Sequence, residues 1–197
     1  MSPEQADSLI FDASVTINFL GTGIAGRLVE LLGQPIVMAD RTFREIQRHP
    51  IRGRDHAAEL DELVRTGFLR IETLNSDAKE LFFELTGDNL VGGLDDGEAA
   101  AIALATFKPQ SALVITDDRK ARNVVSQRWP QQGLAYSIDL LVRPNIESTL
   151  SRPVLADAVY SALKHARMRV PAINRDWAVK LIGENRATEC PSLGSGR

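Results

Sequence analysis

Acidic side chains follow directly after two short apolar segments of the chain. Asp12 follows the run LIF, and the pair Asp117 and Asp118 follows the run LVIT. Because ligands of parallel sheets gather beyond the carboxyl ends of the strands, we expect these acids to lie at one edge of a sheet. Carboxylates brought together repel unless a cation is present, and Mg²⁺ prefers oxygen ligands. The pattern therefore predicts a metal site that could activate water and stabilise charge on a phosphate.

Two glutamates are further candidates for this site. Glu98 begins the segment EAAAIALA, where one acid stands at the mouth of a small, apolar helix, and Glu45 lies among arginines in RTFREIQR. Structural functions are the alternative for all these acids. An Asp at a strand end can cap the next helix, an acid in a first turn complements the helix dipole, and Glu45 can form ion pairs on a solvated helix.

Apolar runs and helical patterns alternate along the chain. Five strands are expected, at 8–12, 34–38, 67–71, 111–116 and 133–136, with helices at 15–32, 41–48, 53–66, 76–85, 94–107, 118–127, 155–167 and 174–183. This alternation predicts a three-layer α/β/α sandwich with a parallel sheet of four to five strands and a helical C-terminal part. We expect a single domain over residues 1–186 and a disordered tail over 187–197, where residues are small and polar.

Composition narrows the function classes. The net charge of -3 excludes a uniformly basic surface, so contact with RNA or DNA would need a local basic patch. The single cysteine, Cys190, allows neither an internal disulfide nor a cysteine-based zinc site. No apolar run approaches the roughly 20 residues of a membrane helix, and the first residues do not form a signal peptide. A cytoplasmic protein is the expectation.

Four segments, in this order, resemble PIN-domain ribonucleases: LIFDASVTINF, the helix around Glu45, GLDDGEAAAIALA and LVITDDRKAR. The resemblance covers roughly residues 9–122. It implies catalytic acids at Asp12, Glu45, Glu98 and Asp117, with Asp118 joining Asp12, Glu98 and Asp117 at the metal. Many relatives have Asp at the position of Glu98, and this longer side chain could change the spacing of a second ion.

The same resemblance implies an activity and its partners. The activity is metal-dependent hydrolysis of RNA phosphodiester bonds, in which water held by Mg²⁺ or Mn²⁺ attacks phosphorus. The family includes toxins of toxin–antitoxin pairs, so an antitoxin protein is the expected partner. A homodimer is a possible assembly. The hydroxyls of Ser14 and Thr116 could orient carboxylates or phosphate. A local basic rim for a phosphate-chain substrate would be formed by Arg119, Lys120 and Arg122.

Two other functions are consistent with parts of the sequence. Gly21, Gly23 and Gly26 match the dinucleotide fingerprint G-x-G-x-x-G, which would make the protein a Rossmann-like nucleotide-binding module. That interpretation requires a strand before the glycines and leaves LIFDAS unexplained. A catalytically silent PIN-like scaffold for protein binding is the third hypothesis. The acids present at all four matching places argue against it.

Overall fold

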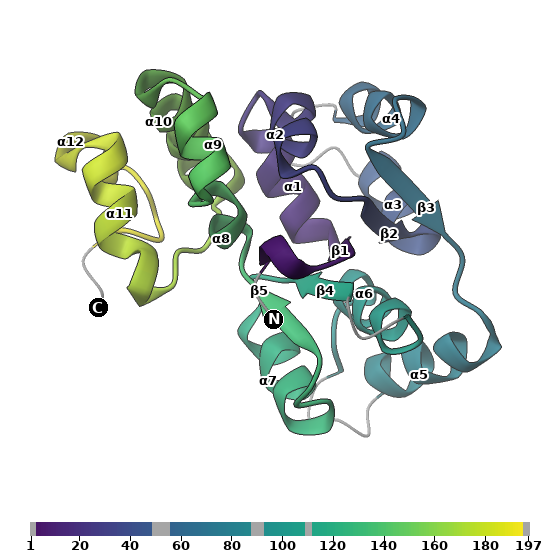
Figure 1. Ribbon diagram of the computed structural model, residues 1–197. Helices are drawn as coiled ribbons and strands as arrows, with labels where there is room; N and C mark the ends of the chain where they lie inside the picture. The colour runs from purple at the N-terminus through teal and green to yellow at the C-terminus, as the bar shows by residue number, and fades with distance from the viewer. Residues whose placement is uncertain (1–2, 49–55, 88–92, 109–111, 195–197) are drawn as a thin grey trace.

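The computed structural model describes residues 3–48, 56–87, 93–108 and 112–194. Five strands form one sheet in the order β3-β2-β1-β4-β5, and every neighbouring pair is parallel (Figure 1). Central β1 pairs Leu9 with Ile36 of β2 on one side and with Leu113 of β4 on the other. The strands are β1 (Ser8–Phe11), β2 (Ile36–Ala39), β3 (Leu69–Glu72), β4 (Ala112–Ile115) and β5 (Gly133–Ala135).

Helices connect the strands and make up the whole C-terminal part. They are α1 (Ala13–Gly21), α2 (Ala25–Leu32), α3 (Asp40–Arg48), α4 (Ala57–Arg65), α5 (Ser76–Thr86), α6 (Asp96–Thr106), α7 (Arg119–Arg128), α8 (Ser137–Leu141), α9 (Pro144–Thr149), α10 (Arg152–Ser161), α11 (Ala172–Ile182) and α12 (Glu184–Thr188). A 3₁₀ turn, η1 (Pro3–Gln5), precedes β1, and a π-helical turn, η2 (Ala162–Ala166), follows α10. Residues 53–55 and 111 of the predicted elements lie outside the described residues.

The sheet is covered on both faces. Along β1, Leu9 and Phe11 belong to the core cluster that contains Phe19 of α1, whereas Ile10 between them belongs to the cluster that contains Phe82 of α5. Successive side chains of a strand point to opposite faces, so the three inner strands β1, β2 and β4 supply both cores. In Figure 1, α1 to α4 lie on one side of the sheet and α5 to α7 on the other. The predicted three-layer parallel architecture is confirmed.

The glycine fingerprint lies between two helices, not after a strand. Gly21 is the last residue of α1, and Gly26 lies in the first turn of α2. Gly23 has a φ of +75° in the connecting turn, a backbone conformation that glycine adopts without strain. The strand–glycine loop–helix context of a dinucleotide site is therefore missing, and the Rossmann-like alternative is wrong for this segment.

Gly21 is required for close helix packing, and Gly26 is its matched control. A Cβ at Gly21 would lie 2.7 Å from the Cβ of Ala166, whereas one at Gly26 would meet nothing within 4 Å. We expect Gly21→Ala to lower the free energy of unfolding by about 1–3 kcal/mol through overpacking. Gly26→Ala should be neutral or raise it by up to about 1 kcal/mol, because it removes a helical glycine. Urea unfolding of both variants tests this, and equal effects would contradict the packing argument.

The expected disordered tail is wrong for residues 187–194. Ala187, Cys190 and Leu193 are buried in the larger core cluster, and the Arg175 guanidinium donates to the Leu193 carbonyl at 2.5 Å. Three small or apolar side chains spaced by three residues are enough to attach this segment, although its composition is mostly polar. The C-terminal helices therefore pack as part of the fold.

Within the described residues, no single helix is long and apolar enough to span a membrane. The pair α1 and α2 has the length and composition, but the two helices are bent by 114° at the glycine turn.

Candidate active site

A cleft of about 310 Å³ opens where β1 and β4 end. Helix α1 supplies one wall through Ser14, Ile17 and Asn18, which recur at helical spacing. The other walls come from the start of α6, the end of β4 and the segment after η2. Their lining residues are Asp95, Glu98, Asp117, Asp118, Ala166, Arg167 and Arg169.

Asp12 links the end of β1 to the start of α1. Its Oδ1 accepts the Val15 N–H and the Ser14 hydroxyl, both at 2.8 Å, so it is the N-cap of α1. Its Oδ2 is buried and has no hydrogen-bond partner among the described residues. Burial raises the pKa of Asp12, although Val15 and the nearby hydroxyls of Thr116 and Ser14 lower it. The capping interpretation is therefore correct for Oδ1, and it does not account for Oδ2.

Asp117 is held from two distant parts of the chain. Its Oδ1 accepts the Ser137 N–H at 2.8 Å, and its Oδ2 accepts the Asn18 side-chain amide at 2.7 Å. Burial raises the pKa of Asp117 to about 6, and the negative charge of Asp12 adds to the rise. Arg122 opposes this effect. The carboxylate is thus oriented before any ligand arrives.

Glu98 lies in the first turn of α6, half-buried at the cleft. Seven consecutive residues after it, 99–105, are buried, and five of them are alanines, which let the helix approach the sheet closely. Desolvation raises the pKa of Glu98 to about 8, with added repulsion from Asp118, Asp12 and Asp95. These acids are therefore close enough to influence one another's ionisation.

Asp118, Thr116 and Ser14 form a supporting network around these carboxylates. Asp118 Oδ1 accepts the backbone N–H groups of Lys120 and Ala121, which makes it the N-cap of α7. Thr116 is buried, and its hydroxyl accepts the Asp118 N–H at 3.3 Å, whereas exposed Ser14 donates to Asp12. Both hydroxyls thus form hydrogen bonds within the protein.

Glu45 lies beside the cleft and lines a different opening. Its Oε2 is 3.7 Å from the position of a Cβ on Gly97, at the start of α6. Asp95 faces the cleft, whereas Asp96 faces a neighbouring groove of about 760 Å³. The groove is lined by Asp40, Arg41, Arg44, Glu45, Thr73, Leu74, Lys79, Phe83 and Asp96. The structure thus brings Glu45 to the mouth of α6 without making it part of the cleft wall.

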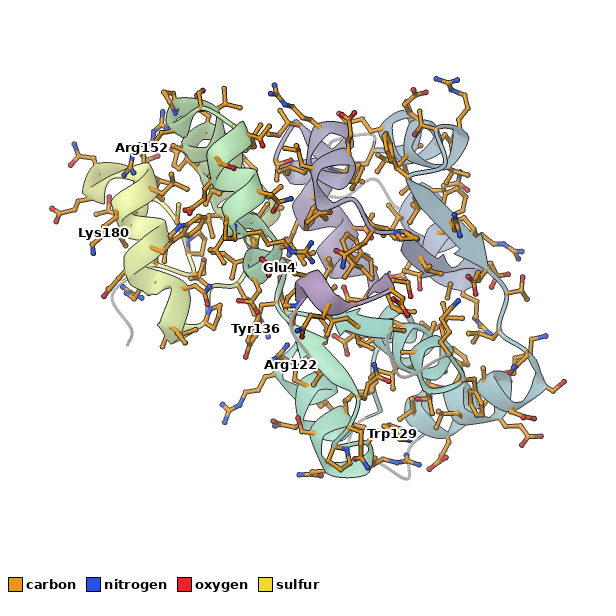
Figure 2. All side chains as sticks on the ribbon, viewed as in Figure 1. Glu4, Arg122, Trp129, Tyr136, Arg152 and Lys180 are labelled. Atoms are coloured by element: carbon orange, nitrogen blue, oxygen red, sulfur yellow. The ribbon has the colours of Figure 1, made fainter. Side chains whose placement is uncertain are left out.

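The three predicted basic residues after Asp118 do not line the cleft. Lys120 donates to the Gly93 carbonyl at 2.7 Å. Arg122 donates to the Thr116 carbonyl at 3.2 Å, and its guanidinium lies 3.6 Å from the centre of the Tyr136 ring. Figure 2 labels Arg122 and Tyr136 near each other. Arg119 is exposed. Lys120 and Arg122 therefore stabilise the backbone beside the acids, at Gly93 before Glu98 and at Thr116 before Asp117.

Sequence reasoning missed four residues of this site: Asn18, Ser137, Arg167 and Arg169. Asn18 stands four residues after Ser14, so its place on the same side of α1 could have been found from helical spacing. Ser137 and the two arginines come from parts of the chain without a motif. Only the tertiary structure brings them to Asp117.

Asn18 is expected to act as a positioning residue for Asp117. Asn18→Ala leaves Asp117 Oδ2 without its donor, which should cost about 1–3 kcal/mol of unfolding free energy. A hydrogen bond to the ionised form lowers a carboxyl pKa, so its loss should move the acid limb of the cleavage pH profile upward. Asn174→Ala is the matched control, because Asn174 is a buried amide that donates to Asp139 outside the cleft. An unchanged pH profile in the Asn18 variant would contradict the positioning function.

The acids fit a divalent cation in donor chemistry. Asp12 offers an unpartnered buried oxygen, and Asp12, Glu98 and Asp117 all have raised pKa values in the absence of a neutralising charge. Among the described residues, no group of three or more acidic, histidine or cysteine side chains is placed to hold a metal ion together. Mg²⁺ suits such a site, because it keeps several waters and uses only one or two carboxylates.

Comparison with known proteins agrees with this geometry. The family model described as DUF3368, a PIN domain, matches residues 8–129, which include β1, β4 and all the acids discussed above. Searches of curated proteins and of solved structures found no match. PIN domains are usually nucleases and generally use divalent metal ions. The matched segment exceeds half of the chain, and the protein therefore belongs to the PIN-domain family.

Proposed function

We propose that the protein is a metal-dependent endoribonuclease whose cation is held by Asp12, Glu98 and Asp117. The observation that carries the proposal is the buried, unpartnered Oδ2 of Asp12, whose charge acts on the Glu98 and Asp117 carboxylates of the cleft wall. Buried charge without a partner is unfavourable, so such an arrangement is expected where a cation compensates it. Family membership supports nuclease activity of this site.

Each acid has a fixed position from which to act. The N-cap bonds orient Asp12, the Asn18 and Ser137 donors orient Asp117, and the closely packed α6 carries Glu98. When bound, Mg²⁺ or Mn²⁺ would neutralise these carboxylates and stabilise the charge that develops on a phosphate. Glu45, at the mouth of α6, is the fourth acid of the proposed site. Pre-organised groups need no rearrangement during the reaction, which lowers its barrier.

The neighbouring groove supports a single-stranded substrate. Phe83 exposes 62% of its surface there, beside Arg44 and Lys79. Exposed aromatic rings can stack on bases, and cations can bind the phosphates of a single strand. An RNA strand crossing the start of α6 would contact both openings.

Chelation tests the proposed function directly. EDTA should abolish cleavage of a labelled single-stranded RNA, and either Mg²⁺ or Mn²⁺ added in excess should restore it. Cleavage by the pure protein that persists in chelator would overturn the metal-dependent mechanism. No cleavage under any of these conditions would instead favour the silent scaffold.

The biological role that we propose is that of a cytoplasmic toxin neutralised by an antitoxin protein. Resemblance to toxin–antitoxin nucleases supports it. Induced expression should arrest growth, and co-expression of a small neighbouring gene should relieve the arrest. Arrest that is equally strong with Asp12→Asn would separate toxicity from nuclease activity and contradict this role.

A further inference from the structure

We propose that Arg167 and Arg169 form a two-arginine clamp that binds a phosphate of the RNA strand at the active-site cleft. Both side chains line the cleft, and both come from the segment after η2, beyond the 8–129 match to the PIN family. The C-terminal helices would thus complete the active site. The proposal rests on the proposed nuclease function for the identity of the ligand.

Arg169 reaches the acids directly. Its Nη1 lies 3.4 Å from Asp118 Oδ2 and 3.4 Å from the Asp117 carbonyl. The Arg169 side chain remains 61% exposed in this pair. Exposed ion pairs of this length contribute little to stability, so the pair does not by itself explain the arginine. Both contacts use one nitrogen of the planar fork, Nη1, and a phosphate, like a carboxylate, can bind such a fork through two parallel bonds.

Arg167 is held by an unusual backbone. Its φ is +55°, and no other non-glycine residue in the described ranges has a positive φ. It directly follows the π-helical turn η2, whose C-terminal Ala166 is also part of the cleft wall. Left-handed residues and π-turns both occur at functional sites, where the surrounding structure compensates for their cost.

Contacts with helix α1 hold this turn in place. Ala166 packs on Gly21 of α1, and the Ser161 hydroxyl donates to the Gly21 carbonyl at 2.7 Å. Met168, between the two arginines, is buried, and its N–H donates to the Ala162 carbonyl at 3.1 Å. The arginine side chains are therefore exposed on a segment whose backbone is anchored to the same helix that carries Asn18.

Charge balance indicates what these arginines bind. Four carboxylates line the cleft, those of Asp95, Glu98, Asp117 and Asp118, and among the described residues of its lining the cationic side chains are the two arginines. A polyanion cannot enter an acidic cleft without local positive charge. Since the protein as a whole is acidic, cations placed at the cleft must provide that attraction.

Binding in a catalytically silent background isolates the clamp. The probe is a fluorescein-labelled single-stranded RNA of mixed sequence, bound to the Asp12→Asn variant in EDTA at several salt concentrations. Adding Arg167→Gln and Arg169→Gln together should weaken binding about tenfold or more and lower the salt slope by about 0.7 for each lost phosphate contact. Arg169→Lys should keep most of the salt slope but not the full affinity, because it retains charge without the fork.

The control pair is Arg152→Gln with Lys180→Gln, which removes equal charge from α10 and α11. Neither residue lines the cleft, and Figure 2 labels both on the C-terminal helices, apart from Arg122 and Tyr136. Affinity and salt slope equal to those of this control would overturn the clamp. Melting temperatures verify folding, and the Lys variant still decides the outcome if the double variant does not fold.

Kinetics separate this inference from the proposed function. With Asp12 intact, the arginine variants should raise KM with little change in kcat, because a clamp on a substrate phosphate binds the ground state and the transition state equally. A wild-type protein that binds RNA through these arginines but never cleaves it would contradict the function and not the clamp. Normal cleavage with an unchanged KM in the double variant would contradict the clamp and not the function.

Discussion

Replacing Asp12 with asparagine is expected to reduce RNA cleavage by about a hundredfold or more while leaving metal-free stability equal or higher. Asparagine keeps an oxygen that can accept the Val15 N–H and the Ser14 hydroxyl, so the cap of α1 is preserved. The asparagine amide nitrogen replaces the unpartnered Oδ2, and the buried negative charge is lost. Burial raises the pKa of the Asp12 carboxyl, so the fold disfavours that charge. Losing a charge that the fold disfavours should raise the melting temperature.

Two further variants separate the cap from the proposed ligand. Asp12→Ala removes both functions, so it should lose activity and also about 0.5–2 kcal/mol of stability. Asn75→Ala removes only a cap, because Asn75 accepts the Ala78 N–H at the start of α5, away from the cleft. It should lose stability and keep activity. A stable, fully active Asp12→Asn protein would show that Asp12 is a helix cap alone.

The fold was predictable because its signals are local. Short apolar runs such as LIF and LVIT, separated by helical patterns, are sufficient to indicate a parallel sheet, and the strand-end acids then fall at one edge by topology. The glycines of 21–26 show the limit of a local motif. The segment VTINFL before them has a strand-like composition, but it is part of helix α1. In this helix Asn18 lines the cleft and Phe19 is buried in the core.

The supporting contacts of the site were not predictable, because they join distant segments. The Asn18–Asp117 and Ser137–Asp117 bonds cross 99 and 20 residues of chain. Arg169 stands 51 residues from Asp118, in a segment that carries no motif. The same reason applies to Cys190 and Leu193, whose burial depends on partners elsewhere in the chain. Residue types can identify acids that attract a cation, but they do not show which donors orient them.

Cation binding to the site is expected to strengthen steeply with pH. The pKa of Glu98 is raised to about 8 and that of Asp117 to about 6, chiefly by burial. Each group therefore binds a proton more tightly in the folded protein than in the unfolded chain. Their stabilising contribution is complete below the ordinary carboxyl pKa and is lost as pH rises, up to about 6 for Asp117 and about 8 for Glu98. The metal-free protein should accordingly melt at lower temperature at pH 8 than at pH 5.

A cation must displace the protons bound to Glu98 and Asp117, and the number displaced determines how steeply its affinity depends on pH. Between pH 6 and 8, release of one proton from Glu98 should lower the Mn²⁺ dissociation constant about tenfold per pH unit, or about a hundredfold in all, with a plateau above pH 8. Glu98→Gln should bind Mn²⁺ more weakly and reach its plateau near pH 6, where Asp117 ionises. Calorimetry at pH 7 in two buffers of different ionisation enthalpy measures the protons released, and Glu98→Gln should release about one proton fewer than the wild type. A dissociation constant that stays flat from pH 6 to 8 would mean that the cation does not bind through Glu98, whereas the same slope in both proteins would assign the proton to another group.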